Sequence, residues 1–509
     1  MREPEVWEHL RAYVLPDVLA NTLWLSLVVG SGVAALGVSL AWLVAMCEFP
    51  GRRILGSALV LPLALPAYVL AFVHVGLWDY SGPIQSAWRS WWGDGAGSLP
   101  VRSATGAAVV FCLALYPYVY LLARQAFQTQ GVQSLQAAQT LGLSRSRAFW
   151  RVAIPMSRPW WVAGVSLALM EMLADFGTVA IFNVDTFTTA IYKTWLGMFN
   201  LTVASQLASL LALVVLALVW LEQSARSRRR FGATARSHAQ DRIALKGWRA
   251  MVASSYCSLV VLAAFGVPMA QLFWWVLQVV ATDLDARYWE FVWHSVLLSA
   301  LSAGVVLAGA IGLAYASRHA PTSGWSGRLV NALVRVSNLG YAVPGMVLSV
   351  GLFVSVAWLD EQIASLLHAI GSTSQVVLRG SLLVMVLALT ARFMAVGFNP
   401  VSTAMQRITP NQELAARSLG LGAWGALRAL HLPLLRPGLL SAALLVFVEV
   451  MKEMPITLLT RPFGWDTLAV RIFEMTSEGM WERAALPSVC IVLVGLLPII
   501  LLIEHAEKH

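Results

Sequence analysis

Long apolar runs separated by short polar and basic stretches dominate this chain. Residues 20–46 and 485–503, for example, contain no charged side chain. Because a helix needs about 20 mostly apolar residues to cross a bilayer, each such run predicts a membrane-spanning helix. Many runs in one chain predict an all-α integral membrane protein, since a helix satisfies its own backbone hydrogen bonds in lipid.

The pattern predicts about eleven transmembrane helices, five in the first half of the chain and six in the second. They are expected at 20–46, 55–77, 104–126, 159–182, 202–221, 252–280, 294–316, 331–357, 376–398, 436–459 and 485–503. The polar, basic segment 222–250 separates the two sets and predicts a cytoplasmic linker. The domains are therefore expected at 1–221 and 251–509.

Composition and charge agree with a membrane protein and give its orientation. The chain is 58% hydrophobic and only 12% charged, with a net charge of +9. In a soluble protein this basic surplus would suggest nucleic acid, but here the arginines cluster in short stretches at 52–53, 145–151, 226–230 and 417–428. Alternation of eleven spans places all four on one side, which the positive-inside rule assigns to the cytoplasm together with the C-terminus.

Cysteines and the N-terminal sequence exclude other readings. The four cysteines are scattered and form no C-x-x-C pair, so neither a disulfide framework nor a thiolate metal site is expected. The polar stretch Met1–Asp17 does not resemble a cleavable signal peptide. The second half begins with a span at 252–280 before Arg287–Trp293, whereas the first half begins directly at the equivalent Val6–Leu10. Either five helices per half suffice, or the chain starts downstream of the true start.

One polar loop occurs twice in matched register. Ala137-Ala-Gln-Thr-Leu-Gly-Leu143 matches Ala415-Ala-Arg-Ser-Leu-Gly-Leu421, 278 residues later, and Pro155 matches Pro433. Two halves in the same orientation imply a pseudo-two-fold axis along the membrane normal, with a pathway between them.

Each copy of the loop, 132–150 and 411–430, is predicted to form a short amphipathic helix with a flat face of small side chains. One such helix alone would equally suit an ordinary helix at the membrane interface. Duplication in register favours a docking surface for another protein. Pro155 and Pro433 are expected to end the loops, and Pro159 and Pro437 to occupy the first turn of the next span.

The duplicated loop resembles the "EAA" loop of permeases of binding-protein-dependent ABC importers. That pattern is Glu-Ala-Ala, three residues, Gly, nine residues, Ile, one residue and Leu-Pro. The matching positions here are Gln136, Ala137, Ala138, Gly142 and Pro155, and Leu414, Ala415, Ala416, Gly420 and Pro433. Both copies lack the motif glutamate. Glu413 is adjacent to Leu414 but about 100° round the helix, so it is no obvious substitute.

The resemblance covers nearly the whole chain and implies two fused type I ABC importer permease domains in a bacterial inner membrane. In that family the loop is the coupling helix that sits in a groove of a cytoplasmic ATPase subunit, and a periplasmic binding protein delivers the substrate. The chain has no Gly-Lys pair and therefore no G-x-x-x-x-G-K-[ST] loop for ATP phosphates. The chain is thus expected to be non-catalytic and without a cofactor, energised by two ATPase subunits that bind ATP.

Acidic residues recur inside one predicted span of each half. Glu171 and Asp175, and likewise Glu449 and Glu453, lie one turn apart and would share a face of a continuous helix. Ionisable groups at such depth suggest a pathway or a buried partner, and four carboxylates would suit a multivalent hard cation. Neutralisation by Lys452, hydrogen bonding between helices and gating are equally ordinary uses, so no metal ligand is assigned.

Further stretches resemble ferric-iron importer permeases. They are Met170–Thr178, Thr186–Tyr192, Lys452–Leu459 and Arg461–Thr467. Permeases for thiamine and for phosphonates look similar and remain alternatives. Contact with the binding protein is expected from 78–103, 183–200, 358–375 and 460–484, where the tryptophans of 88–92 suit an interface belt or a receptor contact.

Ferric-iron import is therefore the leading prediction, with rivals of other classes. An ion-coupled secondary transporter would explain the buried acids but leave the duplicated loops without a purpose. A membrane scaffold or receptor would explain neither feature.

Overall fold

The computed structural model describes residues 3–93, 100–131, 138–227, 242–321, 324–369 and 378–507. These residues are almost entirely helical; two short strands, β1 (Cys47–Glu48) and β2 (Ile243–Ala244), pair in parallel. The prediction of an all-α membrane protein is confirmed. Most of the predicted linker, 228–241, falls outside the described residues.

The chain forms two compact units, Met1–Ala281 with Ile472–His509, and Thr282–Arg471. The helices of unit 1 are α1 (Glu3–His9), α2 (Leu15–Met46), α3 (Arg52–Ala58), α4 (Ala67–Trp78), α5 (Pro83–Trp92), α6 (Ala104–Ala126), α8 (Arg145–Ala148), α9 (Ile154–Ala174), α10 (Gly177–Ile181), α11 (Phe187–Tyr192), α12 (Leu201–Ser227), α13 (Trp248–Val261), α14 (Val267–Asp283) and α24 (Trp481–Glu507). Those of unit 2 are α15 (Ala286–His319), α16 (Trp325–Leu339), α17 (Gly345–Ala369), α18 (Leu382–Gln406), α19 (Pro410–Ser418), α20 (Ala423–Ala426), α21 (Leu432–Met451) and α22 (Pro455–Thr460), while α23 (Leu468–Ser477) continues from unit 2 into unit 1.

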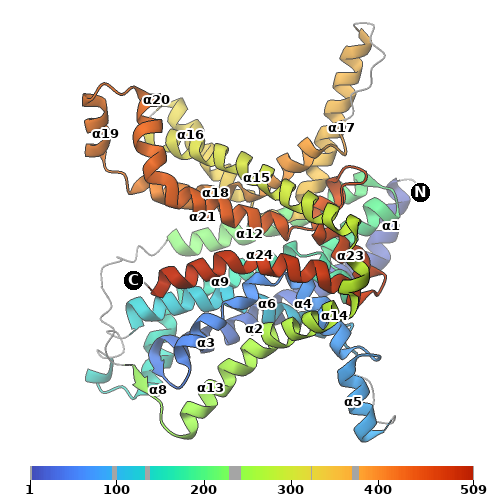
Figure 1. Ribbon diagram of the computed structural model, residues 1–509, viewed down its shortest axis with the longest axis vertical. Helices are drawn as coiled ribbons and strands as arrows, with labels where there is room; N and C mark the ends of the chain where they lie inside the picture. The colour runs from blue at the N-terminus through green and yellow to red at the C-terminus, as the bar shows by residue number, and fades with distance from the viewer. Residues whose placement is uncertain are drawn as a thin grey trace. The chain divides into compact units, whose positions relative to one another are not determined.

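Each unit is built on three long helices packed through glycines. In unit 1, α6 lies between α2 and α9, and an added Cβ at Gly37 or Gly164 would come within 3 Å of Val119. In unit 2, α18 lies between α15 and α21, and a Cβ at Gly397 would come 2.4 Å from Val306. The sequence repeat therefore reappears as the same packing of three helices. Figure 1 shows α19 and α20 at one end of the unit 2 core and α17 extending from the other.

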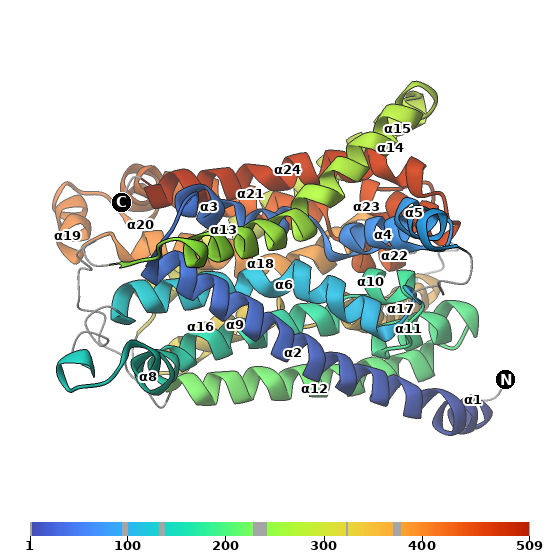
Figure 2. The same ribbon diagram turned by 90° about the horizontal axis from the view of Figure 1, so that it is seen from below.

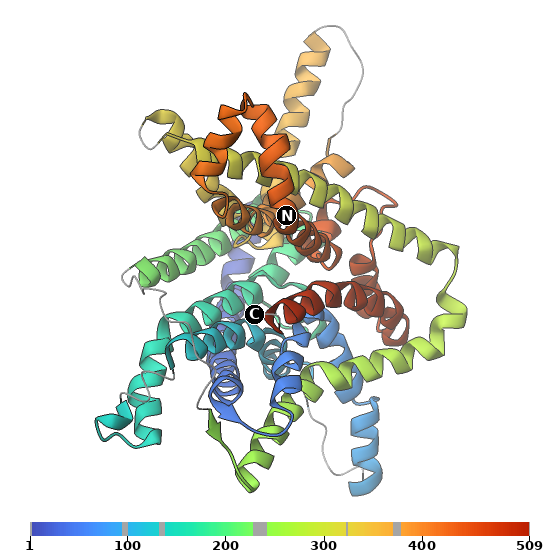
Figure 3. The same ribbon diagram turned by 60° about the vertical axis from the view of Figure 1, so that its left-hand side comes forward.

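Helices from the start and end of the second half complete unit 1. Trp275 of α14 and Trp481 of α24 both stack on Phe72 of α4, with ring centroids 6.1 and 6.3 Å apart. Gly495 of α24 lies against the backbone of Ala64. Figure 3 shows α13 and α14 as one long green arm along unit 1. Compactness and the sequence repeat thus divide the chain differently, and the predicted domain boundaries remain a prediction.

Nine described helices are long and apolar enough to cross a membrane, or ten if one bent pair is a single span, against the eleven predicted. The bent pair corresponds to the predicted span 55–77, which turns by 96° between Ala64 and Ala67, next to Pro66. α9 is not among the nine, because Arg158 and Glu171 reduce its apolar character. In unit 1, α8 and the C-terminus lie at one end, and α10, α11 and the N-terminus at the other (Figure 2).

Two other predicted spans are also interrupted or displaced. The range 331–357 is divided between α16 and α17, and α17 (Gly345–Ala369) provides the apolar length. The range 436–459 contains the end of α21 at Met451 and the start of α22 at Pro455. Averaged hydropathy does not register such breaks, because the residues around them are still apolar.

Candidate functional site

The second copy of the duplicated loop, 411–430, contains a capped helix, α19, that ends at the motif glycine and is followed by α20, instead of the single helix expected. The copies 132–150 and 411–430 are called the first and second docking loops below, after the role that we propose for them. Before α19, Thr409 and Gln412 form a reciprocal capping box. At its end the Gly420 amide donates to the Arg417 carbonyl (2.9 Å), and the Leu421 amide to the Ala416 carbonyl (3.1 Å). Gly420 has φ = +81°. It therefore adopts the left-handed conformation directly after the C-cap residue Leu419, a position at which glycine is favoured.

The first docking loop repeats these bonds at the equivalent positions. The Gly142 amide donates to the Gln139 carbonyl (2.9 Å), the Leu143 amide donates to the Ala138 carbonyl (3.1 Å), and Gly142 has φ = +85°. Gln136 and Ala137 lie outside the described residues. The repeat thus extends to the backbone conformation of the glycine in each loop.

Leucines, rather than the predicted flat alanine face, project from both loops. Leu141 and Leu419, which directly precede the two glycines, are 85% and 81% exposed. Ala138 and Ala416 are buried, although Ala415 is exposed. Leu414, at the position of the motif glutamate, is 59% exposed. An exposed leucine therefore projects from the described part of each loop, among exposed polar neighbours such as Gln139 and Arg417.

The prolines of the motif lie within continuous helical runs instead of ending loops. Helical backbone continues from Arg145 through the π-helical turn Phe149–Ala153 into α9, and from Ala423 through the π-helical turn Leu427–His431 into α21, so Pro155 and Pro433 follow these turns directly. The predicted first-turn prolines, Pro159 and Pro437, lie inside these helices. Helical backbone therefore begins earlier than expected, and a π-helical turn directly precedes each proline, which has no backbone N–H to donate.

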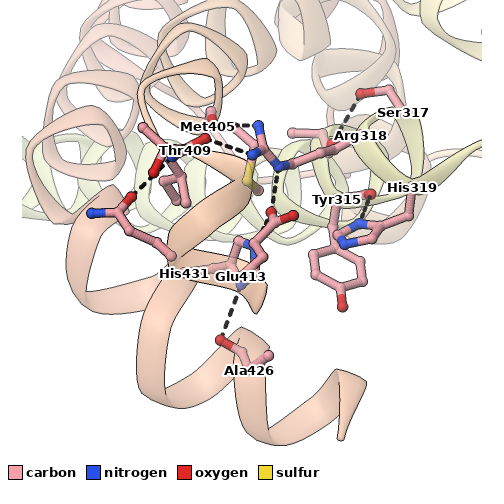
Figure 4. Close-up of polar contacts among 12 residues, drawn as sticks. Tyr315, Ser317, Arg318, His319, Met405, Thr409, Glu413, Ala426 and His431 are labelled. Atoms are coloured by element: carbon pink, nitrogen blue, oxygen red, sulfur yellow. Dashed lines mark hydrogen bonds and ion pairs between the residues drawn. The ribbon is translucent and has the colours of Figure 1, made fainter. Parts of the chain in front are cut away.

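Glu413 faces its own unit. Its Oε1 accepts a hydrogen bond from Arg318 Nε and lies 3.0 Å from His431 Nε2 (Figure 4). Burial alone would raise the pKa of the Glu413 carboxyl, but the interactions with Arg318 and His431 outweigh burial and lower that pKa below its ordinary value of 4.5. Arg318 also donates to the carbonyls of Met405 (3.0 Å) and Ile408. The end of α15 is thereby fixed to the start of the docking loop.

The sequence predicted that Asp175 and Glu453 lie inside continuous helices. In the structure both lie just after a helix has ended. α9 ends at Ala174, and Asp175 Oδ1 accepts from the Thr178 amide at 2.7 Å. Glu453 follows the end of α21 and accepts from the amides of Ile456 (3.0 Å) and Thr457 (3.2 Å). Each carboxylate therefore caps the short helix that follows, α10 or α22, at equivalent positions of the repeat.

Glu171 and Glu449 do lie in the last turns of their helices. Glu449 is ion-paired with Lys452 at 2.7 Å, which realises the neutralisation considered above. Glu171 is half-buried, and alanine occupies the position equivalent to Lys452. The two acid pairs belong to different units. The contacts described account for Asp175 and Glu453 as capping groups and for Glu449 as half of an ion pair.

A cavity of about 250 Å³ opens in unit 1 at the end opposite α8. Aromatic rings of Phe176, Tyr192 and Phe473 meet there, with Phe176 centred 4.8 Å from Tyr192 and 5.2 Å from Phe473. Lys193 and Asp185, an ion pair of 2.5 Å, also line it. The cavity thus joins the expected outer segments 183–200 and 460–484.

Sequence reasoning missed the residues that surround Glu413. Arg318 and His319 end α15, and His431 stands beside the motif proline. Glu413 is 95 residues from Arg318 and 18 from His431. The sequence signal that was available is His431 itself, a polar residue within the otherwise apolar stretch 429–435 that contains the motif proline.

Comparison with known proteins gives similarity over nearly the full length to a permease of two fused halves. The chain is 24% identical to the Fe(3+)-transport system permease protein FbpB 2 of Haemophilus influenzae over 503 residues, 97% of this chain and 91% of that relative. It is 36% identical over 126 residues to the putative 2-aminoethylphosphonate transport system permease protein PhnV of Salmonella typhimurium. That match covers 24% of this chain and 47% of PhnV.

The family assignment rests on both halves. The model of the binding-protein-dependent transport system inner membrane component matches residues 35–224 and again 304–508. The two matches contain the two docking loops and the three packed helices of each unit, apart from the first parts of α2 and α15. The chain is therefore a multi-pass member of the binding-protein-dependent transport system inner membrane component family, with two copies of the family domain fused in one polypeptide.

Proposed function

We propose that this chain is the permease of an ATP-driven importer of ferric iron. The observation that carries the proposal is the similarity to the Fe(3+)-transport permease, which runs through both halves of the chain. The phosphonate permeases match only about a quarter of it. Phosphonate and thiamine are the alternative substrates.

Two copies of a cytoplasmic ATPase dock on the two loops in this proposal. The exposed Leu141 and Leu419 enter apolar depressions on the ATPases, and the glycine caps fix the angle at which each leucine projects. ATP is bound and hydrolysed by these partners, and the chain performs no covalent chemistry. Closure of the ATPase pair then moves both loops and reorients the pathway.

The docking loops and the C-terminus face the cytoplasm in this proposal. The arginine clusters at 52–53, 145–151 and 417–428 support that orientation. A periplasmic binding protein delivers iron to the opposite face, where the cavity around Phe176 and Phe473 lies in unit 1.

Transport by reconstituted vesicles tests the proposal. The full chain is placed in liposomes with its ATPase inside and the binding protein outside, and uptake of radioactive iron is followed with and without ATP. We expect iron uptake that requires ATP, the ATPase and the binding protein together. Excess thiamine or 2-aminoethylphosphonate should not reduce this uptake. Uptake without ATPase under an ion gradient would instead identify a secondary transporter, and competition by either organic compound would reassign the substrate.

A further inference from the structure

Two histidines and a carboxylate converge where α15, α19 and the turn Leu427–His431 meet (Figure 4). One candidate ligand atom from each of His319, Glu413 and His431 lies within 4.8 Å of the other two. His431 is buried, Glu413 is partly buried and His319 is exposed. An ion could therefore reach the cluster from the side of His319.

Backbone carbonyls fix the hydrogen position on both imidazole rings. Nδ1 of His319 lies 2.9 Å from the Tyr315 carbonyl oxygen, and Nδ1 of His431 lies 3.0 Å from the Ala426 carbonyl oxygen. A carbonyl oxygen can only accept, so each Nδ1 carries the hydrogen. Nε2 of each neutral ring then presents its lone pair. Metal-binding histidines are commonly oriented by this kind of bond from the nitrogen that does not bind the metal.

His431 Nε2 faces another acceptor. It lies 3.0 Å from Glu413 Oε1, and a nitrogen lone pair opposite a carboxylate oxygen is unfavourable unless a proton or a metal ion engages the nitrogen. Arg318 donates to the oxygen and so does not engage the nitrogen. A second proton on the ring would satisfy this pair alone. A metal ion would satisfy it and would also use the lone pair of His319, which lies on the exposed side of the cluster.

We propose that His319, Glu413 and His431 bind a divalent first-row transition metal ion. Two imidazole nitrogens and one carboxylate oxygen suit Zn²⁺ or Fe²⁺ and leave a coordination position for water. Donors at about 2.1 Å from a tetrahedral ion lie about 3.4 Å apart, so the exposed His319 rotates inward on binding. Arg318 holds Glu413 Oε1 and leaves Oε2 for the ion. The positive charge of Arg318 repels the metal ion and weakens its binding, so we expect the ion to dissociate readily.

The site is absent from the first half. The positions 278 residues before Glu413 and His431 are Leu135 and Ala153, which cannot bind a metal ion through their side chains. The proposal therefore predicts one ion per chain. Bound metal would tie the docking helix α19 to the end of α15. If the proposed import function holds, metal on the cytoplasmic side of the membrane would stiffen one docking loop. It would thereby change how ATPase closure is transmitted to the transport pathway.

Zinc titration of the full chain, purified without a polyhistidine tag, tests the site. Wild type, His319→Gln and the control His368→Gln, which removes an exposed histidine outside the cluster, compete for Zn²⁺ with a chromophoric chelator. We expect one saturable equivalent in wild type and in His368→Gln, and affinity at least about tenfold weaker in His319→Gln. Equal binding by His319→Gln and wild type, or no stoichiometric binding, would overturn the proposal and leave a proton-bridged ion pair.

Two further measurements do not depend on variants of the buried His431. Co²⁺ should give visible absorption bands in wild type that are missing from His319→Gln. Zn²⁺ should raise the Tm of wild type and of His368→Gln but not of His319→Gln; an equal rise in all three proteins would contradict the site. None of these experiments contains ATPase or iron, so their failure leaves the import function standing, and failure of iron uptake leaves the metal site standing.

Discussion

Asp175 and Glu453 show how one acidic side chain can hold a helix break in an apolar surrounding. Each accepts from a backbone amide three residues further along, at 2.7 and 3.0 Å. A buried amide without a partner destabilises the fold by about 1–3 kcal/mol. The Glu453 carboxylate and the Arg392 guanidinium lie on the same side of Gly345: a Cβ added to this glycine would be 2.9 Å from Glu453 Oε1 and 2.9 Å from Arg392 Nη1. A carboxylate at these positions is thus explained by what it does for its own backbone.

Replacing Glu453 with alanine should therefore destabilise the protein. The buried amides of Ile456 and Thr457 lose their acceptor, which lowers the free energy of unfolding by about 2 kcal/mol. Glu453→Gln keeps an acceptor oxygen and should cause a smaller decrease. The Tm in detergent is the readout, and Glu478→Ala, at an exposed acid, is the control. A Tm for Glu453→Ala equal to that of the control would contradict the capping role.

The Glu413 ion pair should make stability depend on pH. Because the folded-state pKa of Glu413 lies below its ordinary value of 4.5, the charged form stabilises the fold above that value, and the contribution is lost as pH falls through the folded-state pKa. The charged or titratable groups facing Glu413 are Arg318, His319 and His431. The Tm difference between wild type and Glu413→Gln should be largest near neutral pH and shrink below pH 4.5. A difference that stays constant into acid would argue against this assignment.

The docking helix is the element in which local sequence and backbone conformation agree most closely. Its start carries a capping box and its end a glycine with positive φ, in a loop that occurs twice. The pattern of the loop predicted its place and its glycine. It did not predict that leucine would be the exposed side chain, because exposure depends on how α19 packs against α15 and the 405–408 segment.

Gly420→Ala should disturb this helix end. A non-glycine residue in the left-handed region is destabilised by about 1–2 kcal/mol, and Gly420 has φ = +81°. Gly422→Ala is the matched control, since Gly422 has φ = −69° and open space around its Cα. We expect a lower Tm and faster hydrogen exchange in 410–421 for Gly420→Ala alone. Identical behaviour of the two variants would show that the cap does not require glycine.

The double variant Leu141→Asp, Leu419→Asp tests the docking proposal directly. A charge cannot enter an apolar depression without losing its hydration, so copurification of the ATPase should fall at least about tenfold, equivalent to 1.4 kcal/mol. Leu284→Asp, at a partly exposed leucine between α14 and α15, should leave copurification unchanged. Wild-type copurification by the double variant would place the ATPase elsewhere.

At the scale of the whole molecule, sequence alone gave the class and the repeat but not the breaks or the partners of the helices. Apolar length reveals a span, yet the 96° bend at Pro66 and the interruptions at Asp175 and Glu453 are too short to alter an averaged hydropathy. The stacking of Trp275 and Trp481 on Phe72 joins residues hundreds of positions apart. The His319 cluster is equally non-local, so no spacing rule could reveal it.

Separating the chain at its linker should test the composition of unit 1. Residues 1–235 alone lack α13, α14 and α24, and so expose Phe72 and the surface around Ala64. We expect this fragment to aggregate when it is expressed alone and to give a single symmetrical peak in size-exclusion chromatography when 236–509 is coexpressed. A monodisperse fragment 1–235 by itself would show that the later helices are dispensable.

The position of α24 also has a consequence for biogenesis. Domains generally fold as they leave the ribosome, the N-terminal part first. Here unit 1 contains both the first helices of the chain and the last, Trp481–Glu507. The early helices of unit 1 therefore remain incompletely packed in the membrane until translation is nearly finished. During that interval the insertion machinery or a chaperone would have to cover the surface that α24 later occupies. A truncation close to the C-terminus would therefore destabilise the helices that are synthesised first.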